Sequence, residues 1–174
     1  MKQGVVWLTG LSGAGKTTLA HALRDWLSAS GYLVQVLDGD VLRAANPQIG
    51  FDRDSRLRHI VSTARLAADL AADGAIVLVS LISPYREVRQ QARQMCHEFI
   101  EVYVDASLEE CERRDPKGLY RRARAGEIAN FTGVSDVYEA PESPDIRVPT
   151  MGMPVDLSVK VLLEGIKTCW GLAP

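Results

Sequence analysis

Short apolar runs and amphipathic segments alternate along this chain of 174 residues. Strands are predicted at 5–8, 33–37, 75–79 and 99–104. The run at 75–79 is continuously apolar, which is typical of a parallel strand covered on both faces. A shorter strand is expected at 146–148. Apolar residues recur at helical spacing in the segments 17–30, 57–73, 83–97, 107–126 and 156–170. Strands that alternate with helices predict an α/β fold, with a parallel sheet and helices on both of its faces.

Several element boundaries can be predicted from turn-forming residues. Ser83 is expected to cap the helix that follows it, with Pro84 at the first helical position. Residues 44–56 are polar and are expected to form an irregular loop. The segment 107–126 is expected to be helical in two pieces, broken near Asp115-Pro116. Residues 127–154 lack periodicity, and irregular stretches of that length are usually functional or disordered.

The segment 10–17 reads Gly-Leu-Ser-Gly-Ala-Gly-Lys-Thr, which matches the phosphate-binding pattern G-x-x-x-x-G-K-[ST] between a strand and a helix. The glycines let backbone N–H groups turn toward an anion, and the helix N-terminus adds partial positive charge. Lys16 is expected to reach the β- and γ-phosphates and Thr17 to ligate Mg²⁺. A glycine-rich turn that binds nothing is the disfavoured alternative. The expected nucleotide-binding residues are Gly10, Gly13, Ala14, Gly15, Lys16, Thr17 and Thr18.

Two carboxylates, Asp38 and Asp40, flank Gly39 at the end of the second expected strand. The carboxyl ends of parallel strands form the ligand-binding edge of an open α/β sheet, so both should lie near the γ-phosphate. One carboxylate there can accept a proton from an attacking hydroxyl, while the other holds a metal-bound water. We favour Asp40 as the base; the alternative is a pair of loop caps.

Arginines are dense in the next segment, and phosphoryl transfer needs cations that hold an anionic acceptor. A solvated charged face is the alternative, which should hold for some of them. Phe51 and Phe131 stand in irregular loops, where they either stack on a nucleobase or pack the loops onto the core. The four arginines are Arg43, Arg53, Arg56 and Arg58.

A basic helical stretch around Arg113–Arg124, which includes Lys117, is expected to form a lid over the phosphates. The lid would span roughly 113–135, and the alternative is a solvated helix face. We see no metal-ligand set of histidines, because the three histidines stand in separate elements.

Composition narrows the class of protein. The net charge of −2 leaves no basic excess for a nucleic-acid partner. No apolar run is long enough for a membrane span. Cys96, Cys111 and Cys169 are scattered, which favours free thiols in a reducing compartment and therefore the cytoplasm. The length is expected for a single domain over residues 1–174.

These motifs together resemble the adenylylsulfate kinase family from about residue 4 to residue 144. The block 114–133 is the most specific part of the resemblance. The matching segments are 10–18, Leu-Asp-Gly-Asp at 37–40 with Arg43, Gly50-Phe51, Ile-Ser-Pro-Tyr-Arg at 82–86, Phe-Ile-Glu-Val-Tyr-Val at 99–104, Cys111-Glu112, 114–120, 123–126, Phe131-Thr132-Gly133 and Tyr-Glu-Ala-Pro at 138–141.

The resemblance implies a P-loop NTPase-type kinase with a mobile lid, usually a homodimer, that serves sulfate assimilation. It would use ATP and Mg²⁺ and transfer the γ-phosphate to the 3′-hydroxyl of adenosine 5′-phosphosulfate. Asp40 would act on that hydroxyl, Lys117 would bridge the reacting phosphate, and Arg114 would lie near the ATP adenine. The acceptor-side residues that the resemblance implies are Asp38, Arg43, Phe51, Arg56, His59, Ile82, Ser83, Lys117 and Phe131.

Ser83 matches a position often described in the family as a phosphoserine intermediate. Direct in-line transfer needs no such intermediate, and the helix-cap role expected for Ser83 suffices.

The departures from the family pattern are concentrated on the acceptor side. The family usually reads Gly-Phe-Ser-x-x-Asp-Arg-x-Glu-Asn-Ile-Arg-Arg. Here Arg56 survives, but Ser55, Arg58-His59 and Val61-Ser62 replace the Asp, the Glu-Asn pair and the last two arginines. The alternative function is therefore a related kinase with a changed nucleotide acceptor, such as a cytidine diphosphoramidate kinase of polysaccharide modification. A non-catalytic nucleotide sensor is a third hypothesis, disfavoured by intact Lys16, Thr17 and Asp40.

Overall fold

A parallel sheet forms the centre of the molecule in the computed structural model, which describes residues 2–48, 50 and 52–172. Within these residues the sheet has five strands in the order β2-β3-β1-β4-β5, and every neighbouring pair is parallel. The predicted parallel sheet is therefore confirmed. The strands are β1 (Gly4–Thr9), β2 (Val34–Asp38), β3 (Ile76–Ser80), β4 (Phe99–Asp105) and β5 (Ile146–Pro149).

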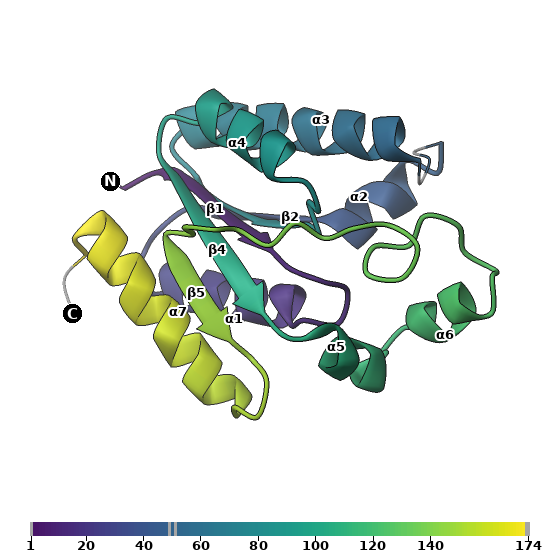
Figure 1. Ribbon diagram of the computed structural model, residues 1–174. Coiled ribbons are helices and arrows are strands. Elements are labelled where there is room, and N and C mark those ends of the chain that lie inside the picture. The colour runs from purple at the N-terminus through teal and green to yellow at the C-terminus, as the bar shows by residue number, and fades with distance from the viewer. Residues whose placement is uncertain (1, 49, 51, 173–174) are drawn as a thin grey trace.

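Helices cover both faces of the sheet, with α3 and α4 on one side and α1 and α7 on the other (Figure 1). Consecutive residues of β1 explain its unbroken apolar sequence, because Val6 and Leu8 pack toward α1 while Val5 and Trp7 pack toward α3 and α4. The helices are α1 (Lys16–Ala29), α2 (Gly39–Ala45), α3 (Arg53–Ala72), α4 (Arg86–Met95), α5 (Leu108–Arg114), α6 (Leu119–Arg124) and α7 (Val155–Trp170).

The expected irregular loop at 44–56 was wrong at both ends, because α2 extends to Ala45 and α3 begins at Arg53. An aspartate caps each of these helices. The Asp38 carboxylate accepts a hydrogen bond from the Asp40 N–H at 2.9 Å and starts α2. The Asp52 carboxylate accepts from the Ser55 N–H at 2.9 Å and starts α3. Both are side-chain caps of the common kind. The irregular connection is therefore much shorter than the polar composition predicted.

The helix expected to start at Ser83 begins instead at Arg86, and Ser83 caps nothing. Ser83 is buried with a φ of 41°, a left-handed conformation that is rare for residues with a side chain. Its hydroxyl accepts a hydrogen bond from the Trp7 indole at 3.0 Å and lies 3.3 Å from the Leu81 carbonyl oxygen. Ser83 is therefore part of the core beneath the sheet edge.

The break predicted at Asp115-Pro116 separates α5 from α6. The Asp115 carboxylate accepts hydrogen bonds from the N–H groups of Tyr120 (3.0 Å) and Arg121 (3.1 Å). It therefore satisfies donors in the first turn of α6, which no intrahelical carbonyl can reach. Both short helices project beyond the carboxyl ends of the strands (Figure 1).

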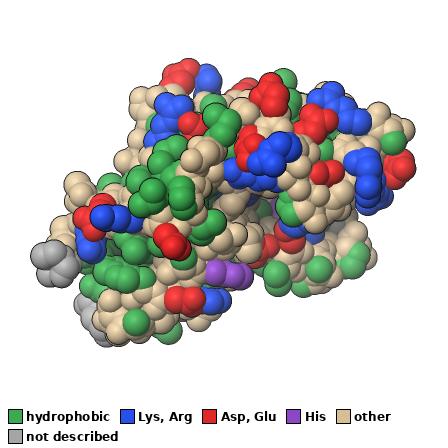
Figure 2. Space-filling model, turned by 90° about the horizontal axis from the view of Figure 1, so that it is seen from below, with side chains coloured by type: hydrophobic (Ala, Val, Ile, Leu, Met, Phe, Trp, Pro, Cys, Tyr) green, Lys and Arg blue, Asp and Glu red, His purple; other side chains and the backbone are tan. Residues whose placement is uncertain are grey.

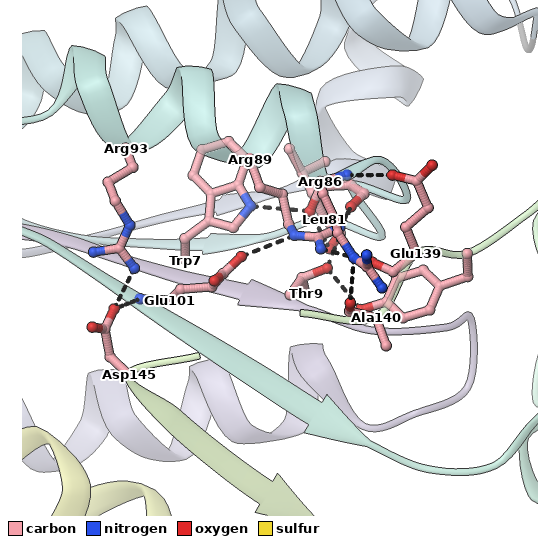
Figure 3. A network of polar contacts seen from close by, with 12 residues as sticks. Trp7, Thr9, Leu81, Arg86, Arg89, Arg93, Glu101, Glu139, Ala140 and Asp145 are labelled. Atoms are coloured by element: carbon pink, nitrogen blue, oxygen red, sulfur yellow. Dashed lines mark hydrogen bonds and ion pairs between the residues drawn. The ribbon is translucent and has the colours of Figure 1, made fainter. Parts of the chain in front are cut away.

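The chain returns from α6 to β5 as an extended segment held against α4 by arginines (Figure 3). The Arg86 side chain contacts the Ala140 carbonyl oxygen, and Arg89 contacts the Glu139 carbonyl oxygen at 2.7 Å. Further along, Arg93 donates to Asp145 at 2.5 Å. This segment is therefore firmly attached although it has no regular secondary structure.

Hydrophobic side chains gather on the left of the molecule seen from below, the side on which α7 lies in Figure 1 (Figure 2). Val155, Leu157 and Val161 of α7 are exposed. Among the residues described, no helix combines the length and apolar content needed to cross a bilayer.

Candidate active site

A cavity of about 900 Å³ opens at the carboxyl ends of the strands, between the segment 10–17 and the helices α5 and α6. It brings together most of the residues predicted from the sequence. Gly10 does not line it, and Phe51 lies outside the described residues. The predicted residues that line it are Gly13, Ala14, Gly15, Lys16, Thr17, Thr18, Asp38, Asp40, Arg43, Arg56, His59, Ile82, Ser83, Arg114, Lys117 and Phe131.

The loop before α1 has the shape of an anion-binding site. Gly13 and Gly15 have φ values of 78° and 109°, which a residue with a side chain rarely adopts. No side chain caps α1, so its first N–H groups remain available to a ligand. The Lys16 ammonium donates to the carbonyl oxygens of Gly10 (2.9 Å) and Leu11 (2.8 Å). Burial lowers the pKa of Lys16 to about 8, so the site favours an anion that would keep this amine charged.

Three oxygen-bearing side chains meet beside the loop. The Thr17 hydroxyl donates to the Asp38 carboxylate at 2.7 Å and lies 3.4 Å from the Ser80 hydroxyl. Oxygen ligands of this kind suit Mg²⁺, which proteins commonly hold by one or two carboxylates together with substrate phosphates. The residues present therefore fit a nucleotide-bound magnesium ion. Among the described residues, no group of three or more His, Cys, Asp or Glu side chains could hold a metal without a ligand.

Asp40 and Lys117 form an ion pair at the mouth of the cavity. Asp40 lies in the first turn of α2, and Lys117 lies in the turn between α5 and α6. Both side chains are at least half exposed, so the pair is accessible to a ligand. The alternative of two loop caps is correct only for Asp38, which caps α2 as well as binding Thr17.

Two arginines, Arg43 and Arg56, line the opposite half of the cavity. Arg56 is buried and donates to Asp136 (2.5 Å), to the Thr132 hydroxyl (3.2 Å) and to the Asn130 carbonyl oxygen. Arg43 donates to the Gly50 carbonyl oxygen at 3.0 Å, and burial together with nearby Arg56 lowers its pKa. The alternative of a solvated face is thus wrong for Arg56.

The other two arginines are placed differently. Arg53 lies over the Tyr85 ring, with 4.1 Å between the guanidinium carbon and the ring centroid. Arg58 is exposed and donates to the Ser55 hydroxyl at 3.1 Å. The structure therefore supports the solvated-face alternative for Arg58.

His59 also lines this half of the cavity. It is only 7% exposed, and its Nε2 atom has no hydrogen-bond partner among the described residues. Burial, with a smaller effect from Arg43, lowers the pKa of His59 to about 4. The imidazole is therefore neutral at physiological pH and can donate to or accept from a ligand.

The structure confirms one of the two sequence-based alternatives for Phe131, packing of its loop onto the core, and stacking on a nucleobase stays a prediction. Phe131 is buried and meets Tyr120 edge-on, with ring centroids 5.1 Å apart and an interplanar angle of 83°. It also lines the cavity. The phenyl ring thus packs the loop onto the core and presents a surface to a ligand.

Sequence reasoning missed Thr150, which supports the nucleotide side. Its hydroxyl donates to the Ala14 carbonyl oxygen at 2.9 Å, and its carbonyl oxygen accepts from Arg114 at 2.7 Å. Arg114 also donates to the Gly13 carbonyl oxygen at 3.3 Å. Thr150 follows β5 directly, so its place at the ligand-binding edge of a parallel sheet was the available signal.

A phosphate loop, a carboxylate just after the next strand and a lysine from the turn between α5 and α6 face one cavity. This combination defines a phosphate-loop phosphotransferase, since phosphoryl transfer depends on positioning and charge stabilisation.

Comparisons with known proteins agree with that class and narrow it. The family model for adenylylsulphate kinase matches residues 2–149. An adenylyl-sulfate kinase of Picosynechococcus sp. is 47% identical over 173 residues, which cover 97% of this chain and 96% of the relative. A probable adenylyl-sulfate kinase of Aeropyrum pernix is 48% identical over 168 residues, covering 94% of this chain and 92% of the relative.

Solved structures point the same way. The Mycobacterium tuberculosis APS kinase CysC, in complex with AMPPNP and APS, aligns with a TM-score of 0.90 at 40% identity. The alignment covers 96% of this chain and 99% of that chain. The chain therefore belongs to the adenylylsulphate kinase family.

Proposed function

We propose that this protein transfers the γ-phosphate of ATP to the 3′-hydroxyl of adenosine 5′-phosphosulfate, giving ADP and 3′-phosphoadenosine 5′-phosphosulfate. The observation that carries the proposal is one cavity lined by the phosphate loop with Lys16, by the Asp40–Lys117 pair and by buried Arg56 and His59. ATP would occupy the loop side, and the acceptor nucleotide would occupy the side of α2 and α3.

Asp40 is the general base in this proposal. Its carboxylate takes the proton of the 3′-hydroxyl as the hydroxyl oxygen bonds to the γ-phosphorus. The bond between that phosphorus and the β,γ-bridging oxygen breaks, and ADP leaves. Lys16 and Lys117 offset the negative charge that develops on the transferred group.

Mg²⁺ belongs to the proposal as a companion of ATP. Thr17 and Asp38 would hold it, because their oxygens lie 2.7 Å apart beside the phosphate loop. The ion would neutralise phosphate charge. Arg114 would contribute on the adenine side of the nucleotide, where Thr150 fixes it.

The acceptor side of the proposal follows the cavity lining. Arg43 and Arg56 would hold the anionic phosphosulfate end, and Phe131, together with Phe51, would stack on the base. Further acceptor contacts are proposed for Asp38, His59, Ile82, Ser83 and Lys117. The proposal does not require a phosphoserine at Ser83. The residue is only 2% exposed, and its hydroxyl accepts a hydrogen bond from the Trp7 indole.

We further propose that residues 1–174 act as one kinase domain, that the lid closes over the bound substrates, and that the protein is a cytoplasmic homodimer. The exposed apolar side chains of α7 favour an oligomer. Light scattering after gel filtration measures the mass directly; a monomer at micromolar concentration would exclude the dimer.

An acceptor panel tests the function. ADP release is measured with ATP, Mg²⁺ and one acceptor at a time: adenosine 5′-phosphosulfate, AMP, a cytidine diphosphoramidate and buffer alone. Turnover is expected with adenosine 5′-phosphosulfate. Turnover only with the cytidine compound would instead favour the alternative acceptor, which the names of the relatives do not support.

A further inference from the structure

The buried Arg56 guanidinium donates all the hydrogen bonds described above to one short loop, residues 130–136. Arg56 donates to Asn130, Thr132 and Asp136, which are all more than 70 positions away from it in the sequence. They engage three of the five N–H groups that a guanidinium carries. The loop therefore fixes Arg56 and leaves N–H groups for a ligand.

The same loop is held rigidly by its own backbone. The Phe131 carbonyl oxygen accepts from the N–H groups of Val134 (3.0 Å), Ser135 (3.0 Å) and Asp136 (3.1 Å). The Gly133 N–H donates to the Asp136 carbonyl oxygen at 2.7 Å, and the Phe131 N–H donates to the Ser135 hydroxyl at 2.9 Å. A shift of Asp136 is therefore expected to shift Phe131 as well, because the two residues are hydrogen-bonded within one loop.

Asp136 is also tied to the segment that precedes α4. The Tyr85 hydroxyl donates to the Asp136 carboxylate at 2.5 Å. Burial, with a contribution from Asp136, raises the pKa of Tyr85, so this hydroxyl stays protonated as a donor. The two segments that meet at this contact are also joined further along the chain. The Glu139 N–H donates to the Pro84 carbonyl oxygen at 2.7 Å, and the residues after Glu139 are bound to α4 (Figure 3).

Among the described residues that line the cavity are Arg56, Phe131 and Thr132, whereas Asp136 is not one of them. Asp136 therefore does not line the cavity itself but contacts Arg56, which does. Its carboxylate joins α3, the loop before α4 and the segment that follows the lid.

We propose that Asp136 is a positioning residue for the acceptor: through Arg56 and Phe131 it sets the geometry of the acceptor half of the cavity without touching either substrate. This inference rests on the proposed function for the identity of the acceptor. A paired guanidinium held in one orientation loses little freedom on binding an anion, so the effect should appear in acceptor binding.

Asp136→Asn tests the inference, because it keeps the side-chain shape and removes the charge. We expect the KM for adenosine 5′-phosphosulfate to rise about tenfold or more, with the KM for ATP within about twofold of wild type. Asp145→Asn is the matched control, since it removes a similar Asp–Arg contact (2.5 Å, to Arg93) outside the cavity. Asp145→Asn should leave the KM for adenosine 5′-phosphosulfate and the KM for ATP within about twofold of wild type. Equal rises in both constants for Asp136→Asn, or an unchanged acceptor constant, would overturn the inference.

Two further variants separate positioning from a general loss of structure. Asp136→Glu should recover part of the acceptor KM, because it restores the charge. In the Arg56→Ala background, Asp136→Asn should raise the acceptor KM by a smaller factor than it does in wild type, since one of the two residues through which it acts is already gone. Additive effects of the two substitutions would contradict the inference.

Limited trypsin digestion tests the inference in the absence of the acceptor substrate. Asp136→Asn should speed cleavage within 113–124 several-fold relative to wild type and Asp145→Asn, because the segment behind the lid is released. Unchanged cleavage would overturn the inference. Failure of the wild type to phosphorylate adenosine 5′-phosphosulfate would instead count against the proposed function, and the digestion result would still stand.

Discussion

Lys117, in the turn between α5 and α6, is ion-paired with Asp40, in the first turn of α2, although they are 77 positions apart in the sequence. The pair spans the mouth of the cavity, above the phosphate loop. A substrate hydroxyl that reaches Asp40 must therefore also lie close to the Lys117 ammonium. This juxtaposition places the group that would take a proton beside the group that would stabilise phosphate charge.

Asp40→Asn should lower kcat by about 10²–10⁴-fold, the range typical for loss of a general base. The affinity for ATP should stay within about threefold, because the phosphate loop is unchanged. Steady-state kinetics and calorimetry check both values. Asp73→Asn, an exposed aspartate at the end of α3, is the control and should behave as wild type. Normal turnover by Asp40→Asn would remove Asp40 as the base.

ATP binding should weaken as the pH rises above about 8. Burial lowers the pKa of Lys16 to about 8 in the free protein, and bound phosphates favour the charged amine. Affinity is thus full below that pH and should fall by up to about tenfold per pH unit above it. Titrations of ATP and Mg²⁺ between pH 7.5 and 9.5 measure this. Lys16→Arg keeps its charge throughout and should show a flatter profile; identical profiles would contradict the expectation.

His59 should make the fold less stable in mild acid. Its pKa of about 4 lies below the unfolded value of 6.5, so the folded state binds fewer protons between these values. Stability is retained above pH 6.5 and decreases as the pH falls toward 4, by about 2–3 kcal/mol for this group. Urea unfolding of wild type and His59→Asn at pH 7 and pH 4.3 isolates the contribution. The same acid-induced loss in both proteins would refute it.

Thr150→Val should weaken ATP binding about fivefold, since it removes a hydrogen bond worth about 1 kcal/mol from the Ala14 carbonyl oxygen. The acceptor KM should not change. Thr168→Val is the matched control, because the Thr168 hydroxyl also donates to a backbone oxygen, that of Glu164, but on the exposed face of α7. A shift in acceptor KM, or equal effects of both variants, would show that Thr150 does not act through the phosphate loop.

The fold could be predicted from the sequence because two of its strands, β1 and β3, are buried on both faces. β1 and β3 are apolar at nearly every position, and the glycines of the phosphate loop fix where β1 ends. The boundaries that failed depended on side-chain caps whose donors cannot be seen in a linear pattern. Asp52 starts α3 inside the segment that was expected to be a loop, and Asp38 starts α2 directly after β2. Ser83 was expected to cap a helix that in fact starts at Arg86.

The nucleotide half of the site could be predicted better than the acceptor half. Gly13, Gly15, Lys16 and Thr17 are contiguous, so spacing alone brings them together. Arg56 instead obtains its partners from residues 130–136, a contact between distant segments that no local pattern encodes. For the same reason Asp136 carried no signal of its own, whereas Thr150 had only its place directly after β5.

The central claim is tested most directly by following the phosphate itself. The protein is mixed with ATP labelled at the γ-phosphate, Mg²⁺ and adenosine 5′-phosphosulfate, and the position of the label in the product is determined by mass spectrometry and phosphorus NMR. We predict one label per product molecule, on the 3′-oxygen, formed by wild type and reduced at least a hundredfold in Asp40→Asn. A label that remains in ATP, or that passes only to a different nucleotide, would contradict the account.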